Sequence, residues 1–126
     1  MNKKKILIVD DEIKILNLFK KAFEKKGYAV HTAETAEEAL EILKNENFKV
    51  MFLDLNLPGI NGLDLCREIR KDRSDAHIFA ITGYASKYEF SDCHEAGFDG
   101  YFIKPVNLKL LYEIAEEAFD KLSTGK

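Results

Sequence analysis

Ile6-Leu7-Ile8-Val9, followed at once by Asp10-Asp11, is a run of β-forming apolar residues that stops at two carboxylates. Val50-Met51-Phe52-Leu53 repeats the pattern and stops at Asp54. Strands this apolar are typically buried on both faces, as in parallel sheets covered by helices. Ligands of such open sheets bind beyond the carboxyl ends of the strands. If the two strands are neighbours, three carboxylates converge on one crevice.

Like charges at close range repel one another, so such a cluster destabilises the fold unless a cation compensates it. The ligands on offer are oxygens, with no cysteine or histidine near them in the sequence. Oxygen-only ligand sets favour magnesium, calcium or manganese over zinc or copper.

Strand-like and helix-like segments alternate along the rest of the chain. The expected strands are 6–9, 28–32, 50–53, 77–81 and 101–103, and the expected helices are about 12–26, 35–43, 63–69, 86–97 and 107–122. Five βα units with short connections predict an α/β fold, a doubly wound parallel sheet with helices on both faces. No linker or repeat interrupts the pattern, so we expect residues 1–126 to form one domain.

Local signals set the ends of several helices. Thr35-Ala36-Glu37-Glu38 and Ser86-Lys87-Tyr88-Glu89 are capping boxes, Asn107 can cap the last helix, and Gly27 and Gly97 can end two others. The expected apolar stripe of the first helix is Ile13, Leu16, Leu18, Phe19, Ala22 and Phe23.

Composition excludes several functional classes. The chain is 46% hydrophobic and 33% charged with a formal net charge of -3, which is typical of a globular protein. Interspersed charges of both signs do not indicate binding to nucleic acid or to a membrane surface. No segment approaches the length of a transmembrane helix. Cys66 and Cys93 lack metal-type spacing, and such sparse use of cysteine fits a reducing cytoplasm.

The expected strand ends carry the residue types that phosphoryl transfer requires. Asp10-Asp11 and Asp54 are joined by Thr82 after the fourth strand and by Lys104-Pro105 after the fifth. A carboxylate can attack phosphorus to form an acyl phosphate, while a metal ion and a lysine neutralise the charge of the transferring group. A hydroxyl can donate to a phosphoryl oxygen.

On these residues, with Pro58 and Gly62 in the loop after Asp54, the chain resembles the receiver domain of two-component response regulators over nearly its full length. The resemblance implies a flavodoxin-like sheet with strand order 2-1-3-4-5, the order found in a chemotaxis member of the same family. It implies that Asp54 accepts a phosphoryl group from the phosphohistidine of a histidine kinase.

The resemblance also implies a role for each remaining site residue. Asp11, Asp54 and the backbone carbonyl of Asn56 would bind magnesium (Mg2+) directly, with Asp10 acting through a bound water. Lys104 would contact the phosphoryl group, and its bond to Pro105 would be cis.

Two further residues would transmit phosphorylation of Asp54 to the surface of the domain. Thr82 would move towards the phosphate and Tyr101 would turn inward, which remodels the face of the fourth helix, fifth strand and fifth helix that partners read. Such switching biases two pre-existing conformations.

The implied protein is a stand-alone, cytoplasmic signalling switch and not an enzyme in the ordinary sense, with a receiver excised from a longer regulator or hybrid kinase as an open alternative. Its partners would be a histidine kinase or a histidine phosphotransfer protein and a downstream target protein whose identity the sequence leaves open. It would act directly on that target or as a relay. We expect a monomer, with phosphorylation-dependent dimerisation through the last helix as an open alternative.

Departures from the family pattern are small. Leu57 stands where the family often has methionine, and Tyr84, near the path of attacking water, is expected to slow loss of the phosphate.

Three other functions compete with this interpretation. A degenerate receiver would act only as an interaction module, against which the intact residue set argues. A magnesium-dependent phosphatase of the haloacid dehalogenase type would need a second aspartate two residues after the first, and Asn56 stands there. A dinucleotide-binding domain would need a glycine-rich first turn, and that turn is Asp-Asp-Glu.

Overall fold

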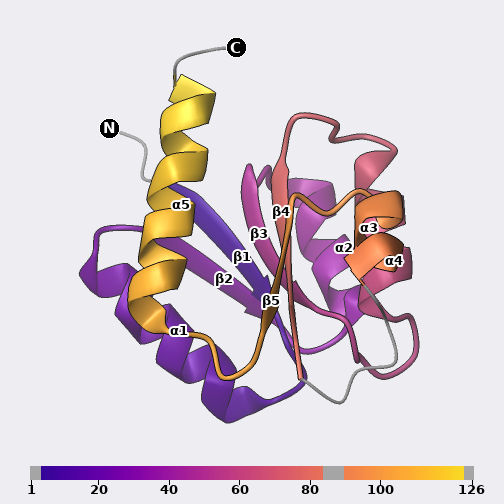
Figure 1. Ribbon diagram of the computed structural model, residues 1–126, viewed down its shortest axis with the longest axis horizontal. Coiled ribbons are helices and arrows are strands. Elements are labelled where there is room, and N and C mark those ends of the chain that lie inside the picture. Colours follow the sequence, from indigo (N-terminus) through magenta and orange to yellow (C-terminus); the bar gives the residue numbers. More distant parts are fainter. Residues whose placement is uncertain (1–3, 84–89, 124–126) are drawn as a thin grey trace.

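The computed structural model of the protein describes residues 4–83 and 90–123. Within them, five strands alternate with five helices along the chain (Figure 1). The strands are β1 (Lys5–Val9), β2 (Ala29–Ala33), β3 (Val50–Asp54), β4 (His77–Thr82) and β5 (Gly100–Ile103). The helices are α1 (Ile13–Lys25), α2 (Ala36–Asn45), α3 (Gly62–Arg70), α4 (Phe90–Ala96) and α5 (Leu108–Ser123). These elements confirm the predicted α/β alternation.

The strands form one parallel sheet in the order β2-β1-β3-β4-β5. Helices α1 and α5 cover one face of the sheet, and α2, α3 and α4 cover the other (Figure 1). The order reverses at β1, whose neighbours are β2 on one side and β3 on the other. The ends of β1 and β3 therefore meet at the topological switch point, where sheets of this class bind ligands.

The two apolar runs are buried because successive side chains point into two different cores. Ile6 and Ile8 pack with residues of α1 and α5, including Phe23. Leu7 and Val9 pack into the second core, beneath α2, α3 and α4. A strand with alternating residues in two cores needs apolar side chains at every position, which explains why β1 and β3 read as continuous runs.

Several predicted helix ends are confirmed. The Glu38 amide donates to Thr35 Oγ1 (3.1 Å), which caps α2, and the Lys109 amide donates to Asn107 Oδ1 (2.8 Å), which caps α5. In a standard capping box the Glu38 carboxylate would accept from the amide of Thr35. Here it accepts instead from the amide of Glu34 (2.7 Å), one residue before the cap. The second predicted capping box, residues 86–89, lies outside the described residues.

Part of the predicted apolar stripe of α1 is wrong. Leu16, Phe19 and Phe23 are buried, but the residues Ile13 and Leu18 are 52% and 53% exposed. Leu18 lies about 100° around the helix from its neighbour Phe19, so it turns away from the sheet although it is apolar. In the part of the chain that the structure describes, no helix combines the length and apolarity needed to cross a membrane.

Candidate functional site

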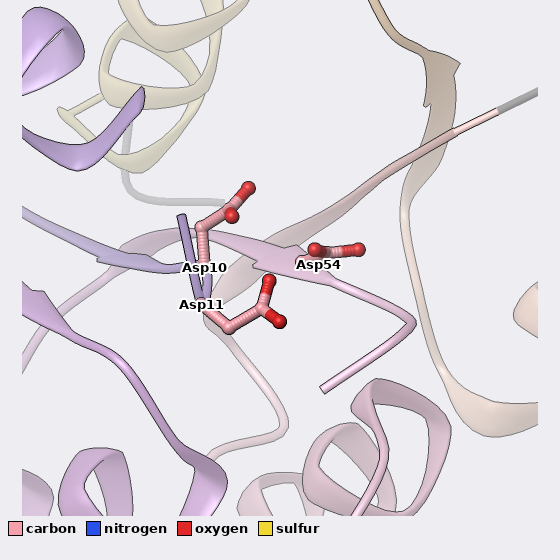
Figure 2. A group of neighbouring side chains, drawn as sticks. All are labelled: Asp10, Asp11 and Asp54. Carbon is pink, nitrogen blue, oxygen red and sulfur yellow. The ribbon is translucent and has the colours of Figure 1, made fainter. Parts of the chain in front are cut away.

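Three carboxylates meet where β1 and β3 end. Val9 pairs with Leu53 in the sheet, so Asp10 and Asp54 occupy equivalent positions at the ends of neighbouring strands. One oxygen from each of Asp10, Asp11 and Asp54 can be chosen so that all three lie within 4.8 Å of one another (Figure 2). The side chains of Asp10 and Asp54 are almost completely buried, whereas Asp11 is exposed to solvent. The structure thus brings together the carboxylates that the sequence placed at one edge.

Lys104 provides a positive charge for this cluster from the end of β5. Its Nζ lies 2.7 Å from Asp10 Oδ2, 3.2 Å from Glu12 Oε1 and 3.4 Å from Asp54 Oδ2. Burial alone would lower the pKa of Lys104, but its hydrogen bond to Asp10 and the charges of Asp10 and Asp54 outweigh burial and raise that pKa. Lys104 is therefore charged at neutral pH.

Asp10 responds mainly to its burial, which raises the pKa of its carboxyl above the ordinary value. The hydrogen bonds from Lys104 and from the Glu12 amide oppose this rise without cancelling it. The charge of Asp54 adds to the rise.

Backbone amides fix the orientation of two of the carboxylates. The Glu12 amide donates to Asp10 Oδ1 (2.8 Å), and the Asn56 amide donates to Asp54 Oδ1 (3.1 Å). Each carboxylate is held by its first oxygen, while its second oxygen faces Lys104. Both side chains are consequently oriented by the turn that follows their own strand.

Thr82 lies at the end of β4 and is fully buried. Its Oγ1 accepts a hydrogen bond from the side-chain amide of Asn56 (3.1 Å), and its backbone carbonyl accepts from the Lys104 amide (2.7 Å). Thr82 therefore links the ends of β3, β4 and β5. The peptide bond between Lys104 and Pro105 is cis.

Gly62 packs directly against the backbone that carries the carboxylate of Asp54. A Cβ atom at this position would lie 2.8 Å from the Cα of Leu55 and closer still to the carbonyl oxygen of Asp54. The Gly62 amide donates to the Leu55 carbonyl (3.0 Å). Only glycine allows this close approach of the loop to the end of β3.

Tyr101 lies on β5 and is partly exposed. Its ring packs edge-to-face on Phe90 of α4, with ring centroids 6.2 Å apart. The ring thus lies between β5 and α4. Tyr84 lies outside the described residues.

Two contacts of the site were missed by sequence reasoning. Glu12, a third carboxylate on Lys104, directly follows the Asp10-Asp11 pair, and this acidic run was the available signal. The bond between the side chains of Asn56 and Thr82 is not predictable from the sequence, because no spacing relates two residues that are 26 positions apart.

The donor set fits a hard divalent cation. Among the described residues, the carboxylates of Asp10, Glu12 and Asp54 contact the ammonium group of Lys104. Asp11 belongs to the same cluster of aspartates, so negative charge is in excess. All the available donors are oxygens, which suit Mg2+. Asp10 and Asp54 are buried and Asp11 is exposed, so the cluster of aspartates is open to solvent on the side of Asp11.

Comparisons with known proteins agree with this geometry. Residues 6–116 match the family described as the response regulator receiver domain. The chain is 36% identical over 104 residues to the transcriptional regulatory protein ResD of Bacillus subtilis (strain 168). The matched residues are 82% of this chain and 43% of that protein. The chain spans less than half the length of the curated relatives it matches.

Solved structures are similar over nearly the whole chain. A response regulator receiver domain protein (CheY-like) from Methanospirillum hungatei JF-1 has a TM-score of 0.89 and 38% identity, and the match covers 98% of this chain and 100% of that chain. The response regulator protein TrrA from Thermotoga maritima, solved in complex with Mg(2+)-BeF, has a TM-score of 0.81 and 38% identity, with 91% and 98% covered.

Proposed function

Because the chain belongs to the response regulator receiver domain family, we propose that it is a phosphorylation-controlled signalling switch whose acceptor is Asp54. Receiver domains of two-component systems are phosphorylatable switches and not classical enzymes. The observation that carries the assignment is the gathering of Asp10, Asp11, Asp54 and Lys104 at one edge of the sheet. Among these carboxylates, Asp54 is the one that contacts Lys104 and also lies beside the Asn56–Thr82 pair.

The proposed reaction is transfer of a phosphoryl group from a phosphohistidine. A carboxylate oxygen of Asp54 forms a bond to phosphorus while the phosphorus–nitrogen bond breaks, and the bonding electrons remain on the imidazole nitrogen. The product is an acyl phosphate on Asp54. Lys104, which already lies 3.4 Å from Asp54 Oδ2, then contacts the oxygens of the transferred group.

Mg2+ is the proposed cofactor. Asp11, Asp54 and the backbone carbonyl of Asn56 would hold it directly, and Asp10 through a water. When bound, the ion supplies charge neutralisation between the carboxylates and the incoming phosphoryl oxygens. The excess of negative charge around Lys104 supports this assignment.

The proposed output is a change in the surface formed by α4, β5 and α5. Thr82 would donate its hydroxyl proton to a phosphoryl oxygen, and Tyr101, which packs between β5 and α4, would turn inward in response. The change biases two conformations that exist before phosphorylation. A target protein would then bind the altered surface.

The proposed partners follow from this chemistry. A histidine kinase or a histidine phosphotransfer protein supplies the phosphoryl group, and the receiver then acts on a target protein or passes the group along a relay. We place this activity in the cytoplasm, because Cys66 and Cys93 are both free and buried, as suits a reducing compartment. The proposed resting state is a monomer, and phosphorylation-dependent dimerisation through α5 is an outcome that a sizing measurement would detect.

The test uses acetyl phosphate as the phosphoryl donor and intact mass as the readout. We expect one phosphoryl adduct in the presence of Mg2+, no adduct after chelation of the metal, and no adduct in an Asp54→Ala variant. An Asp64→Ala variant, which removes an exposed carboxylate of α3, is the matched control and should be phosphorylated normally. Absence of the adduct with both acetyl phosphate and a cognate kinase would favour a degenerate receiver that acts only as an interaction module.

A further inference from the structure

Asn56 makes two hydrogen bonds that connect the phosphoacceptor to Thr82. Its backbone amide donates to Asp54 Oδ1 (3.1 Å), and its side-chain Nδ2 donates to Thr82 Oγ1 (3.1 Å). Asn56 is exposed to solvent, whereas Thr82 is fully buried. An exposed residue therefore donates a side-chain hydrogen bond to a hydroxyl that the fold has removed from water.

The direction of the bond to Thr82 determines what the hydroxyl can do next. A threonine hydroxyl has one proton and two lone pairs, and an amide NH2 group can only donate. By accepting from Asn56, Thr82 uses a lone pair and keeps its own proton available. A hydroxyl that accepts a hydrogen bond also becomes a somewhat better donor, because chains of hydrogen bonds polarise one another.

We propose that the Asn56 side chain is a positioning residue, which fixes the rotamer of Thr82 and keeps its hydroxyl proton available for a phosphoryl oxygen on Asp54 when Thr82 moves towards the phosphate. This inference rests on the proposed function, since it assumes that Asp54 carries the phosphoryl group. It assigns a task to the side chain of Asn56 that is separate from the proposed task of its backbone carbonyl. Substitution of the side chain consequently leaves that carbonyl in place.

A double-mutant cycle tests whether Asn56 acts through Thr82. The probe is beryllium fluoride in the presence of Mg2+, and its apparent affinity for the protein is measured from the bound fluorine signals by NMR. We expect Asn56→Ala to weaken binding about two- to tenfold, which corresponds to loss of one neutral hydrogen bond. In a Thr82→Val background, which keeps the side-chain shape but has no hydroxyl, the same change should have no effect.

Matched variants separate this role from a general effect on the loop. Asn17→Ala removes an exposed amide from α1 and should leave the affinity unchanged. Asn56→Asp replaces the donor by a carboxylate that accepts a hydrogen bond from the Thr82 hydroxyl and so competes with the phosphoryl oxygen, and it should weaken binding more than Asn56→Ala does.

A second readout needs neither metal nor fluoride. With a 13C label on the Thr82 methyl carbon, three-bond couplings from that carbon to the backbone report the χ1 rotamer of Thr82, and therefore the position of Oγ1. We expect a single rotamer in the wild-type protein and averaging over rotamers in Asn56→Ala, with an unchanged melting temperature. A merely structural role of Asn56 would change the melting temperature and leave the couplings as they are.

The outcomes distinguish the inference from the function on which it rests. If the wild-type protein fails to bind beryllium fluoride, the proposed function fails and the inference fails with it. If the wild-type protein binds but Asn56→Ala has the same effect in both backgrounds, or tightens binding, only the positioning role of Asn56 is overturned.

Discussion

Replacing Lys104 by methionine should destabilise the metal-free protein, because no other cation of the described residues lies within 4 Å of the carboxylates of both Asp10 and Asp54. The Lys104 ammonium lies 2.7 Å from Asp10 Oδ2 and 3.4 Å from Asp54 Oδ2. Both carboxylates are almost completely buried. Without the lysine, their mutual repulsion has no compensating charge.

The size of the effect follows from the burial of the groups. Removing one partner from a fully buried ion pair costs about 3–5 kcal/mol of the free energy of unfolding. The Lys104 side chain is 19% exposed, so water screens part of the interaction. Asp10 can also take up a proton, since burial already raises its pKa. We therefore expect Lys104→Met to lower the free energy of unfolding by about 2–3 kcal/mol at pH 7.

Urea unfolding followed by far-ultraviolet circular dichroism measures this loss, because the chain has no tryptophan to report by fluorescence. Lys109→Met, which removes an exposed lysine of α5, is the control and should change the midpoint little. Saturating Mg2+ should stabilise Lys104→Met more than the wild-type protein, since ligands that bind only the native state stabilise it. Equal midpoints for Lys104→Met and the wild-type protein without metal would refute the electrostatic role of Lys104 in the site.

Further predictions concern pH, packing and reactivity. The pKa of Lys104 is raised above its ordinary value of 10.5, so its contribution to stability is complete below pH 10.5 and is lost at higher pH. Urea unfolding measured at increasing alkaline pH should show a fall in the free energy of unfolding that is absent from Lys104→Met. Gly62→Ala should lower the free energy of unfolding by about 1–3 kcal/mol and slow phosphorylation by acetyl phosphate, because the added Cβ collides with the end of β3; an unchanged urea midpoint and rate would contradict this packing. Burial raises the pKa of Cys66 to about 12 and of Cys93 to about 11, so a thiol reagent at pH 8 should react slowly with native protein and rapidly in urea; fast native reaction would show that the thiols are accessible. Arg70 donates to four backbone carbonyls and a carboxylate with its side chain only 18% exposed, so Arg70→Met should cost about 2–4 kcal/mol in the same unfolding assay, and a cost near zero would contradict a structural role.

The sequence predicted the fold well where a residue's surroundings follow from local pattern. Leu7 and Ile8 are adjacent and both buried because they enter different cores, and a continuous apolar run is the direct signature of that arrangement. Leu18 shows where periodicity fails, because an apolar residue next to a buried position of α1 looks like part of the stripe although it faces solvent. The strand order came from resemblance, since periodicity carries no information on which strands are neighbours.

The candidate site was predictable to the extent that strand ends determine it. Asp10 and Asp54 meet because parallel neighbouring strands end at the same edge, and this holds for any side chain at those positions. The partners of Glu12 and Asn56 were not predictable, because they depend on rotamers and on the path of two loops. The conformations of side chains in a turn depend on tertiary contacts, and these contacts produce no recognisable residue spacing in the sequence.

Locating the acyl phosphate chemically shows which carboxylate of the site is the phosphoacceptor. The protein is phosphorylated with acetyl phosphate and Mg2+, the acyl phosphate is reduced with borohydride to homoserine, and peptides are sequenced by mass spectrometry. We predict homoserine at position 54 and unmodified aspartate at positions 10 and 11. Homoserine at position 10 or 11, with Asp54 intact, would contradict the assignment.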